Sequence, residues 1–359
     1  MGSPGTRASS SEKIGSSILI SSKSRPRQPR AAARRIATVP SMAPLPPQPA
    51  ALAELVCAGD RRAIARAISW IEDEHASAGE LVAALWPKTA GALVVGITGP
   101  PGVGKSTLVG ALVREIRNAG QTVGVVAVDP SSPFTQGAVL GDRVRLVEHD
   151  TDDGVFFRSM GSRGRLGGVA EATALASAVL RAANFDVILI ETVGAGQSDI
   201  RIADMSDIVV LALQPGSGDS VQAIKAGVME IPDIVALTKC DLPGVDMFRS
   251  ELRLALSIDP DKAPRLVEVS APNQTGVDEL WTAVLSCREA LGTAAIEARR
   301  QGGLEREAVA AAATRAGARA QHAMDQNPAI QEALAQLHAG TLDPLALAQL
   351  LERHTGGDA

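Results

Sequence analysis

Aromatic residues are scarce in this chain, at 2% of 359 residues, and there is no Tyr. Proteins that bind single-stranded nucleic acids stack bases on aromatic side chains, and this chain has few side chains for that mode of binding. The formal net charge is −5, but residues 1–50 hold eight basic residues and one acidic residue, which leaves −12 for the remainder. Because an acidic body repels phosphate backbones, we expect no nucleic-acid partner.

Cysteine is also scarce, and Cys57, Cys240 and Cys287 lie far apart in the sequence. They form neither a disulfide framework nor a CxxC metal pair, which favours a reducing compartment. We therefore expect a cytoplasmic protein, or one of the mitochondrial matrix if the source is eukaryotic. No apolar run approaches the roughly 18 residues needed to span a bilayer, so we expect no membrane partner.

What the chain has is a hydrophobic content of 45%, enough for one large domain with additions or for two domains. Residues 1–50 are rich in Ser, Arg, Pro and Ala without periodicity, so we expect a disordered basic extension. A solvated tail, an upstream start codon with the working start near Met42, and a mitochondrial-type transit peptide all fit this composition.

Helical periodicity begins in residues 51–91, where we expect an N-terminal helical segment. Asp60 is placed to cap a helix in which Ile64, Ile68 and Ile71 share one face. Such a helix would pack as a small layer against the domain that follows.

Residues 92–291 alternate short aliphatic runs with helical segments such as Thr107–Ala119 and Val169–Ala183. Near-continuous apolar runs are typical of strands buried on both faces. They predict an α/β fold with a mostly parallel, helix-flanked central sheet. The candidate strands are "ALVVGIT", "TVGVVAVD", "VFFRS", "DVILIE", "DIVVLAL", "DIVALT" and "RLVEVS".

The last segment, residues 292–359, is Ala-rich and helical, with turns at Asn327-Pro328 and Asp343-Pro344. Its apolar faces are narrow for an independent core. A dimerisation arm and a helical cap on the same chain fit equally well.

A phosphate-binding motif, "GPPGVGKST", follows the first strand and opens a helix. Its backbone amides and the helix N-terminus would cradle phosphate oxygens, so the sheet is predicted to be that of a P-loop nucleoside triphosphatase. Lys105 should reach the β- and γ-phosphates, and Ser106 should ligate Mg²⁺. The predicted nucleotide-binding residues of this loop are Gly99, Pro100, Pro101, Gly102, Val103, Gly104, Lys105, Ser106 and Thr107.

Acidic residues at the ends of strands are candidates for holding the metal. Glu191 ends a strand in "DVILIETVGAGQSD" and would contact Mg²⁺ directly or through water. Asp129 and Asp142 would join it at the carboxyl edge of the sheet, although an Asp before Pro often only caps a turn.

Gly194 and Gln197, which follow Glu191 in the sequence, are candidates for acting near the γ-phosphate. The Gly194 amide would sense this phosphate, and Gln197 would orient the attacking water. A solvent-exposed loop Gln is the alternative for Gln197.

Five arginines follow the second strand, and one of them could act as an internal arginine finger. Surface ion pairing is the alternative for each. They are Arg143, Arg145, Arg158, Arg163 and Arg165.

The stretch "VALTKCDLPG" predicts a guanine-reading loop. Asp241 would accept from guanine N1–H and the 2-amino group, neither of which adenine offers. Lys239 would lay its aliphatic stem along the base. Thr238 stands in place of the usual Asn and would lose one hydrogen bond, worth about 0.5–1.5 kcal/mol. The bidentate contact of Asp241 with the base contributes roughly 1–3 kcal/mol. Because the contact of Asp241 is the larger of the two, we expect the preference for guanine to survive. Cys240 is expected to be a small buried side chain rather than a reactive thiol.

A second base-contacting loop is predicted at "SAPNQTG". A backbone amide at Ser270 or Ala271 would donate to guanine O6, where adenine would present a donor of its own.

With these motifs in order, the chain resembles the MeaB/ArgK family of P-loop GTPases over about residues 50–290. The resemblance rests on "GITGPPGVGKSTL", "VDPSSPFTQGAVLGDRVRL", "FFRSMGSRGRLGGVA", "ETVGAGQSDI", "GDSVQAIKAGVMEIPDIV" and "SAPNQTG". It implies a GTPase that gates adenosylcobalamin delivery to a cobalamin-dependent acyl-CoA mutase, above all methylmalonyl-CoA mutase, and protects that mutase.

The same resemblance assigns residues to roles in this chain. It implies a Mg²⁺–GTP site formed by Lys105, Ser106, Asp129, Asp142 and Glu191, and a base site formed by Thr238, Lys239 and Asp241. It also implies an extra switch over Gly216–Gly227 that faces the mutase, and a homodimer through the C-terminal helices. Thr238 departs from the family's Asn, and the arm lacks the Trp-containing stretch expected after the GTPase domain.

Two other functions remain open at this point. A nickel-insertion GTPase would share the nucleotide core, but its metal motifs pair Cys with His, and none of the five His here pairs with a Cys at ligand spacing. An ATP-dependent small-molecule kinase or transport ATPase would fit an older label of the family, but adenine pairs badly with Asp241.

Overall fold

The computed structural model describes residues 45–46, 48–89, 91–129, 152–161, 166–192, 197–216, 232–256 and 263–356, without the side chains of 129, 166–169 and 197–200. Residues 1–44 lie outside these ranges, so the disordered basic extension stays a prediction. Within the described residues, no helix is both long and apolar enough to cross a membrane.

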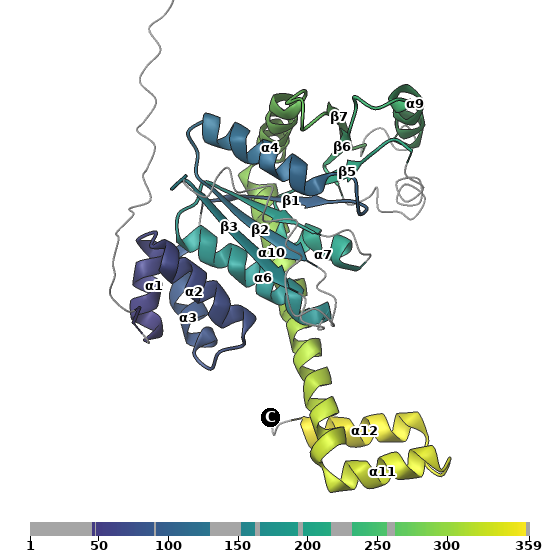
Figure 1. Ribbon diagram of the computed structural model, residues 1–359. Helices are drawn as coiled ribbons and strands as arrows, with labels where there is room; N and C mark the ends of the chain where they lie inside the picture. Colours follow the sequence, from purple (N-terminus) through teal and green to yellow (C-terminus); the bar gives the residue numbers. More distant parts are fainter. Residues whose placement is uncertain are drawn as a thin grey trace, which may run out of the picture. The chain divides into compact units, whose positions relative to one another are not determined.

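Seven parallel strands form one sheet in the order β3-β2-β4-β1-β5-β6-β7 (Figure 1). All seven predicted strands are confirmed, and most of these aliphatic runs are buried on both faces. The strands are β1 (Leu93–Thr98), β2 (Val123–Asp129), β3 (Val155–Gly161), β4 (Val187–Glu191), β5 (Ile208–Leu213), β6 (Ile234–Thr238) and β7 (Arg265–Val269).

Helices cover both faces of this sheet (Figure 1). Alternate residues of β4 show the two cores: Val187 and Leu189 join the core under α4 and α10, whereas Ile188 and Ile190 join the core under α6 and the N-terminal helices. The helices of the GTPase region are α4 (Lys105–Asn118), α6 (Leu166–Ala182), α7 (Gln197–Met205), α9 (Val245–Leu256) and the first part of α10 (Val277–Gln326).

The N-terminal helices form the layer that the sequence predicts. Ile64 and Ile68 are fully buried and Ile71 is nearly so, and the Asp60 carboxylate accepts from the Ala63 amide, so the predicted cap is confirmed. The layer consists of α1 (Pro49–Cys57), α2 (Arg61–Glu72), α3 (Ala78–Leu85) and the short 3₁₀ turn η1 (Trp86–Lys88).

The C-terminal helices α11 (Pro328–His338) and α12 (Pro344–Thr355) begin at the two predicted turns. Asn327 and Asp343 cap them, and each is followed by Pro at the first helical position. These two helices and the end of α10 share a small core of their own, centred on Ile330, Ala333 and Leu347.

Helix α10 is 50 residues long and begins at Val277, so it runs through both the predicted GTPase region and the predicted C-terminal segment. Gly292 interrupts it, with φ 70° and ψ 168°. A positive φ of this kind suits Gly because it lacks Cβ. The first part packs in the core beside β7, with Leu280 and Val284 buried, and the second part continues to the arm.

Candidate functional site

The phosphate loop lies between β1 and α4, at the centre of the carboxyl edge of the sheet. Gly99 has φ +139°, and a Cβ there would lie 2.2 Å from the Ala212 carbonyl oxygen of β5. Only Gly fits this position, which brings the loop against the neighbouring strand. Residues 99–107 therefore adopt the strand–loop–helix geometry that the motif requires.

Lys105 is the first residue of α4 and is only 7% exposed. Its ammonium donates to the carbonyl oxygens of Gly99 (2.6 Å) and Pro100 (3.0 Å). A buried ammonium beside a loop of backbone amides at a helix N-terminus creates a positive potential suited to phosphate.

Ser106 and Glu191 meet at the edge between β1 and β4. These strands are neighbours, with Ile97 paired to Glu191, so the end of β4 faces the start of α4. The Ser106 hydroxyl donates to Glu191 Oε1 at 2.6 Å, and the Glu191 side chain is buried. A hydroxyl and a carboxylate oxygen are the hard ligands that Mg²⁺ prefers.

The other predicted residues of this edge are only partly described. Asp129 is the last residue of β2, and β2 is the other neighbour of β4, which places its backbone at the same edge. Gln197 is the first residue of α7. Their side chains, and all of Asp142 and Gly194, lie outside the described residues.

Of the five candidate arginines, Arg158 alone is described. Its guanidinium pairs with Glu72 and lies 3.1 Å from the Ser69 hydroxyl, both on α2. This structural ion pair favours the non-catalytic alternative for Arg158. Arg143, Arg145, Arg163 and Arg165 lie outside the described residues.

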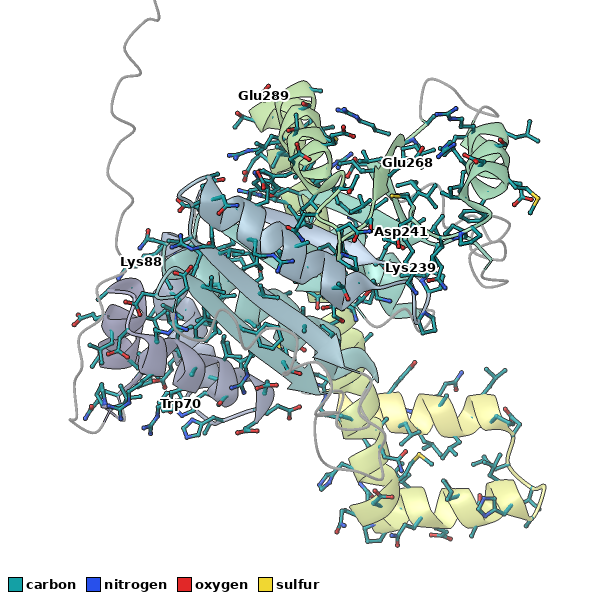
Figure 2. The ribbon with its side chains drawn as sticks, turned by 45° about the horizontal axis from the view of Figure 1, so that its top comes forward. Trp70, Lys88, Lys239, Asp241, Glu268 and Glu289 are labelled. Atoms are coloured by element: carbon teal, nitrogen blue, oxygen red, sulfur yellow. The ribbon has the colours of Figure 1, made fainter. Side chains whose placement is uncertain are left out.

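The base-reading loop follows β6, and Figure 2 labels Lys239 and Asp241 on it. Lys239 has a left-handed φ of 54°, and its ammonium donates to the Gly102 carbonyl oxygen of the phosphate loop at 2.8 Å. Asp241 is exposed, so its carboxylate faces solvent, where a base could reach it.

Thr238 behaves in a way that the sequence did not predict. We expected a side chain of reduced reach toward the base, but its hydroxyl turns inward. The hydroxyl oxygen lies 2.7 Å from the Val103 carbonyl oxygen and 2.9 Å from that of Leu213, and the side chain is buried. No local sequence signal marks this role, since it depends on two strand ends and the phosphate loop, which meet only in the fold.

Cys240 lies between these residues and is half-buried. Burial, followed by the nearby carboxylates of Glu268 and Asp241, raises the pKa of its thiol above the ordinary value. A raised pKa keeps the thiol protonated at neutral pH, which favours the interpretation of an inert side chain.

The second loop, at Ser270 and Ala271, closes on itself through an antiparallel bridge. The Ser270 amide donates to the Thr275 carbonyl oxygen at 3.0 Å, and the Thr275 amide donates back at 3.1 Å. Because the Ser270 amide is used inside the loop, Ala271 is the better candidate of the two for donating to a base.

A pair of arginines in the second part of α10 was also missed by the sequence analysis. Arg300 makes two 2.6 Å contacts with the buried carboxylate of Asp207, just before β5. Arg299 pairs with Asp233, just before β6, at 2.9 Å. These hydrogen bonds raise the pKa of both guanidinium groups, so both stay charged. Nothing in the Ala-rich sequence around them indicates that they hold α10 to the sheet.

Among the described residues, no group of three or more His, Cys, Asp or Glu side chains is arranged to hold a metal ion.

Comparison with known proteins agrees with this geometry. The family model described as "Methylmalonyl Co-A mutase-associated GTPase MeaB" matches residues 64–325. A protein of Pyrococcus abyssi is 50% identical over 246 residues, which are 67% of this chain and 76% of that protein. The GTPase ArgK of Escherichia coli is 34% identical over 244 residues, which are 65% of this chain and 74% of ArgK.

A solved structure shares the fold over most of the chain. The crystal structure of a LAO/AO transport system kinase superposes with a TM-score of 0.62 and 25% identity, covering 86% of this chain and 97% of that one. The predicted α/β P-loop fold and the resemblance are thereby confirmed. The chain belongs to the MeaB family and is a GTPase of that family.

Proposed function

We propose that this GTPase is a chaperone that gates adenosylcobalamin delivery to a cobalamin-dependent acyl-CoA mutase of the methylmalonyl-CoA mutase type, and protects that mutase. The observation that carries the proposal is the family match over residues 64–325, whose description names association with methylmalonyl-CoA mutase. An assembled phosphate loop and base-reading loop support it, since such a chaperone needs a working nucleotide switch.

In this proposal the phosphate end of GTP lies on residues 99–107. Lys105 exchanges the carbonyl oxygens of Gly99 and Pro100 for the β- and γ-phosphates. Ser106 and Glu191 would hold Mg²⁺, with Asp129 and Asp142 as further ligands or positioners of its waters. When bound, Mg²⁺ would supply positive charge that neutralises the phosphates. Gly194 senses the γ-phosphate and Gln197 orients the attacking water.

The base end of GTP is read by Asp241, which accepts from N1–H and the 2-amino group. The Ala271 amide donates to O6, and the Lys239 stem lies along the ring. This arrangement selects guanine because adenine lacks both donors and would oppose the Ala271 amide with its own amino group.

Two further parts would serve the partner. Residues 216–227 would form an extra switch that faces the mutase, and the C-terminal helices would hold a homodimer. The exposed apolar side chains of Val309 and Leu345 on α10 and α12 support a dimer, because their burial would be favourable.

GTP hydrolysis tests the proposal when the purified protein is assayed alone and with methylmalonyl-CoA mutase, with ATP as the parallel substrate. We expect slow turnover of GTP alone, faster turnover with the mutase, and none of ATP. Lys105→Ala should abolish both GTP rates, which excludes a contaminating hydrolase.

The other outcomes are equally informative. Unchanged slow GTP turnover, with no binding between the two proteins, would contradict the chaperone role and leave the GTPase assignment in place. ATP turnover faster than that of GTP would contradict guanine selection and favour the small-molecule kinase alternative.

A further inference from the structure

The hydroxyl of Thr238 is a buried link between the ends of β5 and β6 and the phosphate loop. Its oxygen lies 2.7 Å from the Val103 carbonyl oxygen in the phosphate loop and 2.9 Å from the Leu213 carbonyl oxygen at the end of β5. Carbonyl oxygens only accept, so the hydroxyl donates to both. It has one hydrogen for two acceptors, in a side chain that is 5% exposed.

Each end of this link belongs to a different part of the site. Val103 is in the loop that would hold the phosphates, and Leu213 is the last residue of β5, where the chain leaves the sheet. Thr238 itself ends β6 and comes directly before the base-reading residues 239–241. Lys239 makes the second tie to the phosphate loop, at Gly102, but from an exposed position. The buried tie is therefore the one less weakened by competition from water.

We infer that Thr238 is a positioning residue for GTP hydrolysis: its hydroxyl joins the base-reading loop to the phosphate loop and to the end of β5, and does not read the base. With its hydrogen directed at two carbonyl oxygens inside the protein, the hydroxyl has none left to offer a base. Removing it should loosen the phosphate loop as well as the base loop.

The carbonyl oxygens of Val103 and Leu213 compete for the single hydrogen of the Thr238 hydroxyl. An Asn amide carries two hydrogens and could serve both carbonyl oxygens at once, whereas a Thr hydroxyl shares one between them. A displacement of the end of β5 would therefore change how strongly Thr238 holds Val103.

Binding of two ligands by calorimetry tests the inference: GDP, which occupies both ends of the site, and Mg²⁺-pyrophosphate, which occupies the phosphate end alone. Thr238→Val keeps the shape of the side chain and removes the hydroxyl. We expect Kd to rise about tenfold for both ligands, since a buried carbonyl oxygen loses its donor. A group that only contacted the base would change Kd for GDP alone, and a merely structural group would change neither.

Two other variants complete the test. Thr238→Ser keeps the hydroxyl and should stay within about twofold of the wild type for both ligands. Thr122→Val is the matched control, because Thr122 is also buried and its hydroxyl donates to Asp186 at the opposite edge of the sheet. It should lower Tm and leave both Kd values unchanged.

Three results would overturn the inference: a weakened Kd for GDP with an unchanged Kd for pyrophosphate in Thr238→Val, no change for either ligand, or an equal loss in Thr238→Ser. Should Thr238→Val fail to fold, Thr238→Cys replaces it, since a thiol is a weak donor of similar size. The same two Kd values then decide the question.

Discussion

At the scale of single residues, the site is held together by contacts between backbone carbonyl oxygens and a few donors. Lys105 holds the two carbonyl oxygens of its own loop, Lys239 holds Gly102, and Thr238 holds Val103. Asp241 differs from these because it is exposed and available to a ligand. In the function proposed above, positioning by Thr238 and recognition by Asp241 are divided between neighbouring residues of one short loop.

The role of Asp241 leads to a prediction of changed base preference. In Asp241→Asn the side-chain oxygen still accepts from N1–H, but the new amide opposes the 2-amino group of guanine. KM for GTP should rise about 10- to 100-fold, the equivalent of roughly 1–3 kcal/mol. Xanthosine triphosphate, which has an oxygen at position 2, should become the better substrate.

Steady-state hydrolysis of the two nucleotides by the wild type and by Asp241→Asn measures this change. An unchanged preference for GTP in the variant would show that Asp241 does not read the base. Asp246→Asn, an exposed carboxylate on the adjacent helix α9, is the control and should leave both KM values unchanged.

At the scale of elements, α10 and α7 lie unusually close together. A Cβ at Gly303 of α10 would lie 2.0 Å from the Asp204 carbonyl oxygen of α7. Ion pairs flank this contact, from Arg201 to Glu307 and from Arg306 to Asp204, each at 2.5 Å. Helix α7 begins close after Glu191, so α10 packs against the element that follows the phosphate edge in the chain.

Gly303→Ala should therefore separate the two helices. The methyl group meets backbone rather than a flexible side chain, so we expect a loss of about 1–3 kcal/mol in the free energy of unfolding. Gly317→Ala is the matched control, since Gly317 lies in the same helix and a methyl group there would meet nothing within 4 Å. It should stabilise the protein by up to about 1 kcal/mol.

Denaturation by urea, followed by circular dichroism, measures both changes. Equal effects of the two substitutions would contradict the close contact between α7 and α10.

Much of this architecture could be predicted from the sequence. Buried strands appear as aliphatic runs, a helix cap appears as Asp60, turns appear as Asn327-Pro328 and Asp343-Pro344, and the phosphate loop appears as a motif, because each depends on neighbours in the chain. The inward hydroxyl of Thr238 and the pairing of Arg300 with Asp207 could not be predicted, since their partners lie 135 and 93 residues away.

At the scale of the whole molecule, the C-terminal arm has little core of its own. Ile330, Ala333 and Leu347 are its buried centre, while Val309 and Leu345 are 70% and 76% exposed. A second copy of the chain would cover such side chains most simply through a two-fold contact. The predicted homodimer can therefore be tested at these two side chains.

We expect light scattering after gel filtration to give the mass of a dimer for the wild type. The double substitution Val309→Asp and Leu345→Asp should give a monomer, because it places charge in an apolar contact. Met247→Asp is the control: Met247 on α9 is 70% exposed as well but lies outside the arm, so the dimer should persist. A monomeric wild type would contradict the prediction.

The break at Gly292 bears on how the molecule opens. An unbroken helix of this length would unwind as a single cooperative unit, but the break gives α10 two units with separate ends. The second unit can fray from the arm inward and stop at Arg299 and Arg300, leaving the first unit in the core. We therefore expect disorder that begins at the C-terminus to leave the first part of α10 packed in the core beside β7.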